Sequence, residues 1–304
     1  MHTTSFEIKP VTLDDKPILD SYFKQGEFLN SEFTFTNMFI WQKPYNIRYA
    51  QSDGNLCIFS RHGNGLESVN MTTMQGDVSA TVPKILEYFS QINQAPQIRI
   101  FGKDQKERMK ELFPDMFRYE KDINSADYVY KTENLINLPG SRYHAKRNHI
   151  NKFKSLYDFS YKPITPELCK DCRTLFAQWC ETKKDTVSNI DEQLYAVNTL
   201  LDNFENLDIK GGCITVDNQL VAFSFGEVLC QKESIVVIHL EHADTNFHGS
   251  FPIMNQQFLE NQWSDYHFVN REEDMGLEGL RKAKKSYYPA FLTDKYILTL
   301  ANPK

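Results

Sequence analysis

The chain has 304 residues, of which 41% are hydrophobic and 13% aromatic, and its formal net charge at pH 7 is −6. This length is enough for two compact domains or one large one. The negative charge argues against a surface devoted as a whole to nucleic acid, and no apolar run approaches the ~20 residues of a membrane-spanning helix.

The first part of the chain, residues 1–132, alternates helical and strand patterns and predicts one α/β unit. Apolar residues at helical spacing predict helices at 12–29, 81–92 and 105–113. Alternating or β-branched runs predict strands at 46–50, 55–60, 97–101 and 127–131. The Asp53-Gly54 pair favours a tight hairpin between the first two strands.

The rest of the chain, residues 133–304, predicts a second unit with a similar order of elements. Its helices are predicted at 141–157, 166–183, 191–203, 251–262 and 277–287. Its strands are predicted at 159–162, 208–216, 219–229, 234–241, 266–270 and 295–300. Because no low-complexity or Pro/Gly/Ser-rich linker separates the parts, we expect an α/β fold of two halves packed together.

The cysteine pattern does not predict a metal site. The six cysteines are scattered among apolar patterns, and the one Cys-x-x-Cys spacing, Cys169 to Cys172, lies within a predicted helix. Without a second such pair, we predict buried free thiols.

The N-terminal residues indicate the compartment. Residues 1–7 contain no cationic patch followed by an apolar stretch, so we expect no signal peptide and a cytoplasmic protein. The sequence leaves peripheral membrane contact open, and it does not fix the oligomeric state.

A loop at residues 244–250 (DTNFHGS) precedes the helix predicted from residue 251. Ser250 suits the N-cap of that helix, and Gly249 would let the backbone approach a ligand closely. Free N–H groups at a helix start favour phosphate or carboxylate. Many such junctions bind nothing, so an anion site and an ordinary turn both stay open.

The strand before this loop ends in two groups that can carry protons. With period-two alternation, His239 and Glu241 face the same side and could line a site beside the loop. Either one could act as general base towards an amine or hydroxyl. The alternative is a solvated strand end with ordinary polar residues.

The segment 270–289 follows a strand, so its polar start lies at a strand's carboxyl end, where open α/β sheets bind ligands. At 100° per residue, the buried stripe of its helix is predicted as Leu277, Leu280, Ala283 and Tyr287. Lys284 falls inside this stripe and Arg281 at its margin, which costs desolvation unless an anion or carboxylate meets them. Pairing with acids at 272–274 and contact with an anionic ligand both stay open.

The segment 142–157 also places a cation within the predicted apolar stripe of a helix. No Asp or Glu occurs from Asn134 to Tyr157, and Lys146 falls within the apolar stripe, with Arg147 beside it. Two helices that each turn a lysine inward could converge on one anionic group.

The residues that carry a family resemblance are segments 143–153 (YHAKRNHINKF), 270–276 (NREEDMG), 279–284 (GLRKAK), 286–289 (SYYP), 31–35 (SEFTF) and 40–41 (IW). They resemble an uncharacterised bacterial family related to the C-terminal, cytosolic domain of phosphatidylglycerol lysyltransferases. That family is similar to the tandem GNAT folds of Fem-type aminoacyl transferases. The resemblance implies an α/β (α+β) fold of two GNAT-like mixed-sheet halves.

The resemblance also implies transfer of an acyl or aminoacyl group from acyl-CoA or aminoacyl-tRNA onto an amine or hydroxyl. GNAT enzymes that use coenzyme A usually show Gln/Arg-x-x-Gly-x-Gly/Ala at the strand–helix junction. Residues 246–251 (NFHGSF) hold one glycine, which favours the acceptor end of aminoacyl-tRNA as the anionic donor. We expect no cofactor beyond the donor itself.

We accordingly expect Glu241 to act as base, with Tyr287 or Tyr288 as general acid and His239 as a further catalytic candidate. The candidates for donor binding are Lys146, Arg147, Asn148, Gly249, Ser250, Asn270, Arg271, Arg281 and Lys284. Two alternatives stay open: a coenzyme A-dependent N-acyltransferase acting on a small amine, and a non-catalytic anion-binding protein of the same fold.

Overall fold

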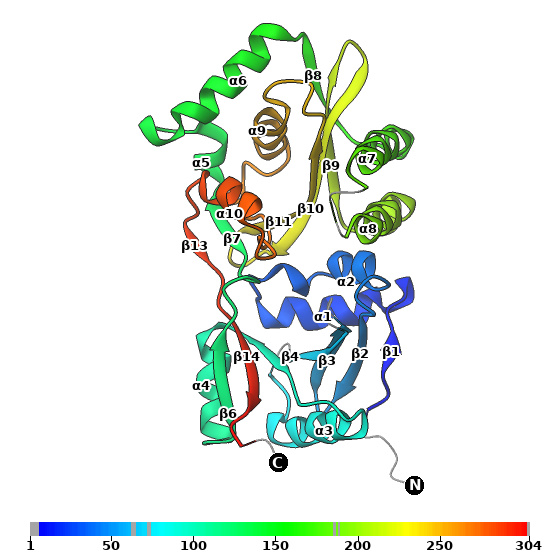
Figure 1. Ribbon diagram of the computed structural model, residues 1–304, viewed down its shortest axis with the longest axis vertical. Coiled ribbons are helices and arrows are strands. Elements are labelled where there is room, and N and C mark those ends of the chain that lie inside the picture. The colour runs from blue at the N-terminus through cyan, green and yellow to red at the C-terminus, as the bar shows by residue number, and fades with distance from the viewer. Residues whose placement is uncertain (1–5, 62–64, 72–73, 185–186, 188, 303–304) are drawn as a thin grey trace. The chain divides into compact units, whose positions relative to one another are not determined.

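The computed structural model describes the chain except residues 1–5, 62–64, 72–73, 185–186, 188 and 303–304 (Figure 1). The described chain forms two compact units. The first comprises Met1–Ala126, Glu273–Gly276 and Leu292–Lys304, and the second comprises Asp127–Glu272 and Leu277–Phe291.

The first unit is built on a seven-stranded sheet of order β1-β2-β3-β4-β5-β14-β6. These strands are Lys9–Pro10, Arg48–Ser52, Asn55–Arg61, Glu67–Met71, Ile98–Phe101, Lys295–Leu300 and Phe117–Lys121. The helices are α1 (Lys16–Gly26), α2 (Phe35–Trp41), α3 (Val78–Gln91) and α4 (Gly102–Leu112). The predicted hairpin is confirmed, because Asp53 and Gly54 both adopt positive φ between paired β2 and β3.

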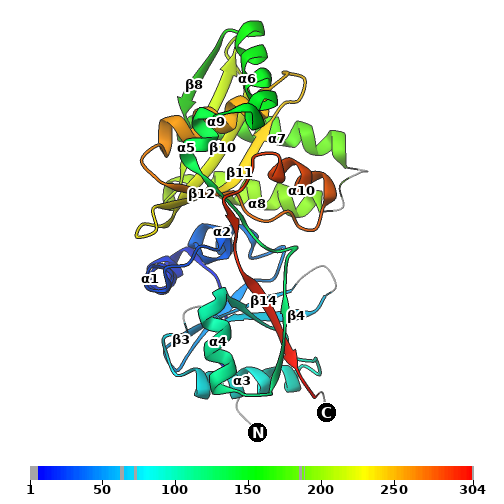
Figure 2. The same cartoon turned by 90° about the vertical axis from the view of Figure 1, so that its left-hand side faces the viewer.

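The second unit is built on a sheet of order β13-β7-β12-β11-β10-β9-β8. These strands are Phe291–Leu292, Tyr128–Lys131, Phe268–Asn270, Ile235–Ala243, Gln219–Cys230, Lys210–Val216 and Phe159–Pro163. The helices are α5 (Thr132–Asn137), α6 (His144–Leu156), α7 (Cys169–Lys183), α8 (Ile190–Asp202), α9 (Ser250–Gln262) and α10 (Glu278–Lys285). Helices α7 and α8 cover one face, while Figure 2 looks onto the face that α5, α6 and α9 cover.

Both sheets are mixed, and each contains a parallel pair joined by a crossover helix. In the first sheet this unit is β4–α3–β5, and in the second it is β11–α9–β12. Parallel neighbours need such a crossover, whereas antiparallel neighbours need only a turn. The predicted α/β architecture of two mixed-sheet halves is therefore confirmed.

The predicted boundary differs from the observed one in two places. Strand β7, predicted within residues 1–132, pairs with β12 of the second sheet. Strand β14 at the C-terminal end pairs with β5 and β6 of the first sheet. A local hydrophobic pattern identifies a strand but not its partner, so neither exchange could be predicted.

One strand pair creates the end of the sheet where the candidate site lies. Strands β11 and β12 pair in parallel only from Ile235↔Phe268 to Val237↔Asn270. Strand β12 ends there, while β11 continues to Ala243 against β10. Side chains at the end of β11 and just after β12 therefore meet where this parallel pairing stops.

The predicted buried stripe of the last helix is wrong. No residue of α10 is buried, and Leu277 is 57% exposed; of the four stripe residues only Tyr287, beyond the helix end, is buried. The physical reason is the inward Lys284, whose ammonium donates to the backbone carbonyls of Arg271 and Glu272. A polar contact thus takes the place of apolar packing beneath this two-turn helix.

Candidate functional site

A buried ion pair joins the ends of β11 and β12. The Nη2 atom of Arg271 lies 2.9 Å from Oε1 of Glu241, and the two side chains are 16% and 11% exposed. The other carboxylate oxygen, Oε2, accepts a hydrogen bond of 3.2 Å from Nδ2 of Asn255 on α9. Burial alone would lower the pKa of Arg271, but the Glu241 carboxylate together with Tyr130 and Tyr287 outweighs the effect of burial, and the pKa is raised. The guanidinium is therefore held charged in a largely dry environment.

Two tyrosine rings flank this guanidinium. The Cζ atom of Arg271 lies 5.1 Å from the ring centroid of Tyr287 and 6.0 Å from that of Tyr130. Burial raises the pKa of Tyr287 to about 12 and also raises the pKa of Tyr130. Both phenols are therefore protonated at neutral pH, and Tyr287 retains a proton that it can donate.

Lys146 on α6 adds a second cation beside the Tyr287 ring. Its Nζ lies 3.9 Å from the ring centroid of Tyr287, and the side chain is half-buried. Burial lowers the pKa of Lys146, the positive charge of Arg271 lowers it further, and the Glu241 carboxylate opposes both effects only in part. Within the described chain this ammonium has no hydrogen bond or ion pair. The site thus holds two cations and one carboxylate.

Two other cations that were predicted to bind the donor instead donate hydrogen bonds to backbone carbonyls. Lys284 donates to the carbonyls of Arg271 and Glu272, the latter at 3.2 Å, and Tyr130 donates to the carbonyl of Lys284 at 2.9 Å. Arg147 donates to the carbonyls of Leu138 and Gly140. Lys284 thereby fixes the segment that carries Arg271. Arg281 lies half-buried on α10.

His239 is enclosed between two carboxylates. Its Nε2 lies 2.7 Å from Oε1 of Glu227 on β10, and its Nδ1 lies 2.9 Å from Oε1 of Glu272. Burial alone would lower its pKa, but the two carboxylates raise it to about 9. A charged imidazolium with both nitrogens engaged is a poor general base, so this geometry supports a structural role rather than the predicted catalytic one.

The loop before α9 is closed by its own hydrogen bonds. The predicted N-cap is wrong: Gly249, at φ 88°, is the cap, and Ser250 is the first helical residue. The Ser250 hydroxyl donates to the carbonyl of Asp244 at 2.8 Å, and its N–H donates to that of Phe247 at 3.0 Å. A Cβ atom on Gly249 would lie 2.5 Å from the carbonyl oxygen of His149, so glycine here permits α6 to approach.

The remaining candidates lie outside this cluster. Asn270 is fully buried, and its side chain bonds Asp127 at 2.8 Å and the N–H of Glu272 at 2.7 Å. Tyr288 is 44% exposed, with its ring 5.4 Å from that of Tyr143. Asn148 is exposed and contacts His144.

The structure thus brings together Glu241, Arg271, Tyr287 and Lys146, and adds Asn255 and Tyr130, which sequence reasoning missed. The sequence contained a feature that could have identified Asn255. It is a polar residue among the buried Ile253, Met254 and Phe258 of α9, the same kind of anomaly that marked Lys146.

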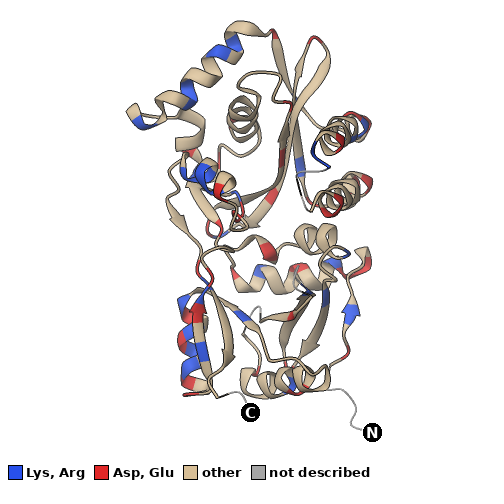
Figure 3. Ribbon diagram, viewed as in Figure 1, with Lys and Arg blue, Asp and Glu red and all other residues tan. Residues whose placement is uncertain are grey.

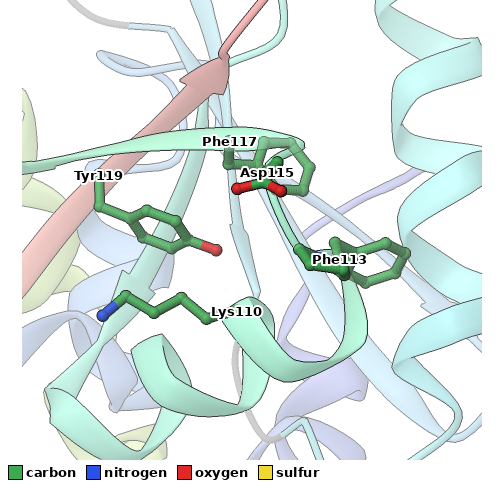
Figure 4. A pocket seen from close by; sticks show the side chains of 6 residues that line it. Lys110, Phe113, Asp115, Phe117 and Tyr119 are labelled. Carbon is green, nitrogen blue, oxygen red and sulfur yellow. The ribbon is translucent and has the colours of Figure 1, made fainter.

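A pocket of about 320 Å³ lies in the first unit and is lined by residues of α4, β6 and the turn between them (Figure 4). Its charged groups are Lys110 and Asp115, and Lys110 already pairs with Glu107 at 3.0 Å. Its other side chains are Phe113, Pro114, Phe117 and Tyr119. This lining lacks the clustered base, acid and uncompensated cation found at the end of β11.

The described residues do not bring a set of metal ligands together. They contain no group of three or more His, Cys, Asp or Glu side chains able to hold a metal ion. All six cysteines are buried, as predicted. In the described part of the chain, no helix has the length and apolar character needed to span a bilayer.

Residues 23–299 match the family model described as "Phosphatidylglycerol lysyltransferase, C-terminal". Among curated proteins, an uncharacterized protein of Mycoplasmoides gallisepticum is 23% identical over 186 residues. These residues are 60% of this chain and 59% of that protein, so the chain spans about three-fifths of this relative's length.

Among solved structures, a conserved protein of unknown function from Bacteroides thetaiotaomicron is 31% identical, with a TM-score of 0.89 over 97% of this chain and 99% of that one. L-PGS from Bacillus licheniformis is 15% identical, with a TM-score of 0.65 over 97% and 94%. FemX is 11% identical, with a TM-score of 0.60 over 96% of both chains. These similarities confirm the predicted relation to phosphatidylglycerol lysyltransferases and the predicted likeness in fold to Fem-type proteins.

Proposed function

Because the chain belongs to the family of phosphatidylglycerol lysyltransferase C-terminal domains, we propose that it transfers an aminoacyl group from aminoacyl-tRNA to an amine or hydroxyl acceptor. The family supports acyl or aminoacyl transfer as the reaction class. The residues at the ends of β11 and β12 supply groups suited to that chemistry.

One observation carries the proposal: the site has more positive than negative charge, in a largely dry environment. Glu241 compensates Arg271, but no carboxylate of the described chain pairs with Lys146. A half-buried, unpaired ammonium is costly unless an anion meets it. The terminal phosphate of a donor, or the oxyanion formed during acyl transfer, is such an anion.

The reaction needs a base, a stabilised oxyanion and an acid for the leaving group. Glu241 takes a proton from the acceptor as its nitrogen or oxygen attacks the ester carbonyl of the aminoacyl group. Lys146 and Arg271 stabilise the negative charge that develops on the carbonyl oxygen. As the ester C–O bond breaks, Tyr287 donates its phenolic proton to the ribose oxygen, and the proton on Glu241 returns to the phenolate through solvent.

Tyr287 fits the acid's role better than Tyr288, which is exposed and makes an edge-to-face contact with the Tyr143 ring. The donor preference rests on the loop before α9. It holds one glycine, and Ser250 is engaged with Asp244 and Phe247. These contacts leave little of the open, glycine-lined turn that a coenzyme A pyrophosphate would need.

The test is transfer of radiolabelled amino acid from a mixture of aminoacyl-tRNAs to hydroxylamine or to phosphatidylglycerol vesicles. Wild-type protein is expected to form labelled product, and Tyr287→Phe to lower the rate about 10²-fold or more. Tyr288→Phe is the matched control and is expected to retain activity. Release of label at the uncatalysed rate, together with tight binding of acetyl-CoA by calorimetry, would instead favour a coenzyme A donor.

A further inference from the structure

Strand β6 (Phe117–Lys121) forms one edge of the first sheet, whose strand order ends in β5-β14-β6. Its inner neighbour β14 pairs with it in antiparallel orientation. No strand of the described chain pairs with the outer side of β6. An open edge of this kind presents backbone N–H and C=O groups that can pair with another strand.

The register with β14 shows which backbone groups of β6 face outward. The N–H of Asp122 donates to the carbonyl of Lys295, and the N–H of Ala301 donates to the carbonyl of Met116. Hydrogen-bonded residues alternate along an antiparallel pair, so every second residue between Met116 and Asp122 bonds to β14. The residues whose N–H and C=O groups point to the open side are Phe117, Tyr119 and Lys121.

The other edge strands of the described sheets are protected against pairing. Strands β1 and β13 have two residues each, and β1 contains Pro10. In β8, the N–H of Ile164 donates to the carbonyl of Gly211, so the same alternation places Pro163 on the open side, where it offers no N–H. Strand β6 has five residues and no proline. Among these edges it is therefore the one best suited to accept another strand.

The charges around β6 indicate the kind of partner. Residues 102–121, which include α4 and β6, contain six Lys or Arg and five Asp or Glu, and Figure 3 shows both signs interspersed there. A nucleic acid or an anionic bilayer would require a cationic surface instead. Arg118 and Glu120 are exposed, and their side chains form no hydrogen bond or ion pair within the described chain. A protein strand with complementary charges fits this surface.

Arg118 and Glu120 are complementary to a second copy of the same strand. When two copies of β6 pair antiparallel with Tyr119 opposite Tyr119, Arg118 of each copy lies opposite Glu120 of the other. Opposite charges at directly opposed positions stabilise an antiparallel pair. The same register pairs the outward backbone groups of the two copies, and no other antiparallel register opposes Arg118 to Glu120.

We propose that the chain forms a two-fold symmetric dimer in which β6 of each copy extends the first sheet of the other. Because symmetric pairing makes one surface its own complement, the contact closes at two copies. The proposal does not depend on the transfer reaction, since association requires no catalysis.

Exposed apolar residues at both ends of β6 add to this contact. Met116, just before the strand, is 37% exposed, and Ile123, two residues after it, is 60% exposed. Antiparallel pairing places the end of one strand beside the start of the other, so Ile123 of one copy lies towards Met116 of the second. The pocket of Figure 4, which includes Phe113 and Phe117, lies at this start of β6. The dimer therefore covers apolar surface as well as backbone groups.

The experiment is sedimentation velocity of the full chain from about 1 µM to about 1 mM protein, a range that covers weak specific association. Wild-type protein is expected to change from monomer to dimer within this range. Arg118→Glu and Glu120→Arg each oppose like charges twice in the dimer, and each should weaken association about tenfold. Arg118→Glu/Glu120→Arg restores the opposed charges and should associate like wild type. A one-to-one mixture of the two single variants should form a heterodimer for the same reason.

A proline variant tests the backbone pairing. Lys121→Pro removes an outward N–H without removing a hydrogen bond to β14, and should weaken association about tenfold or more. Lys121→Ala is the matched control, because it also loses the side chain and its ion pair with Asp294 but keeps the N–H. This control should associate like wild type, and circular dichroism checks that each variant folds.

Three results would overturn the proposal. The first is wild-type protein that stays monomeric at every concentration. The second is a dimer that neither single charge variant weakens, which would place the contact on another surface. The third is failure of Arg118→Glu/Glu120→Arg to recover association, which would exclude the register centred on Tyr119.

Discussion

The ammonium of Lys146 on α6 lies 3.9 Å from the centre of the ring of Tyr287, which follows α10. Within the described chain this ammonium makes the cation–π contact but no hydrogen bond or ion pair. Arg271 lies 5.1 Å from the same ring. Two cations therefore lie beside the Tyr287 ring, and of these two only Arg271 forms an ion pair with a carboxylate. The predictions below follow from this imbalance and from the contacts that maintain it.

Replacing Lys146 by methionine should leave the free energy of unfolding unchanged or raise it by about 1 kcal/mol. A half-buried ammonium without an ion pair is a desolvation cost, while the methionine side chain keeps the contact with the Tyr287 ring. Urea denaturation at neutral pH measures this. A loss of several kcal/mol would show that Lys146 has a structural role instead.

Glu241→Gln should destabilise the protein by about 3 kcal/mol, because it leaves the buried Arg271 guanidinium without its carboxylate. The Glu241→Leu/Arg271→Met double variant should recover most of this loss, since both charges are removed together. Denaturant midpoints of the single and double variants test this. Additive losses would mean that the two charges are not coupled.

Stability should fall as the pH rises from about 6.5 to about 9. The pKa of His239 is raised to about 9 by Glu227 and Glu272, against an unfolded value of 6.5. The stabilisation is therefore fully present below pH 6.5 and is lost as the pH rises through the folded pKa. We expect a loss on the order of 1–3 kcal/mol.

His239→Gln provides the comparison for this pH dependence. The variant should be less stable than wild type at pH 6 and should show a flatter stability profile up to pH 9. An unchanged profile would assign the titration to another group.

Gly249→Ala should destabilise by about 1–3 kcal/mol, because the new Cβ would lie 2.5 Å from the His149 carbonyl oxygen and φ is 88°. Gly279→Ala on α10 is the matched control. A Cβ there meets nothing within 4 Å, so this helical substitution should stabilise by up to about 1 kcal/mol. Thermal unfolding of both variants checks the contrast, and equal effects would contradict it.

Much of the fold was predictable because it is encoded locally. The Asp53-Gly54 hairpin and the β-branched strand β11 have patterns that tertiary structure did not override. Strand β14 shows the limit. Its pattern predicts a strand at 295–300, but its place between β5 and β6 of the first sheet depends on partners about two hundred residues away.

The site was predictable to a similar extent. Lys146 and Glu241 stood out because a charge occupied an apolar stripe or strand end, and the structure brings both near Tyr287. The same reasoning predicted a buried apolar stripe on α10 that the structure does not have. A helical wheel gives the direction of a side chain but cannot show that Lys284 would donate to a backbone carbonyl. Asn255 was missed although its polar side chain lies among apolar neighbours.

The most direct test is the binding of a non-hydrolysable analogue of the aminoacylated tRNA acceptor end, measured by calorimetry. Lys146→Gln should weaken binding about 10–100-fold, as expected for the loss of one charge-assisted hydrogen bond. Lys152→Gln, at an exposed position of the same helix, should bind like wild type. Equal affinity of wild type and Lys146→Gln would contradict the claim that the uncompensated charge beside Tyr287 receives the donor.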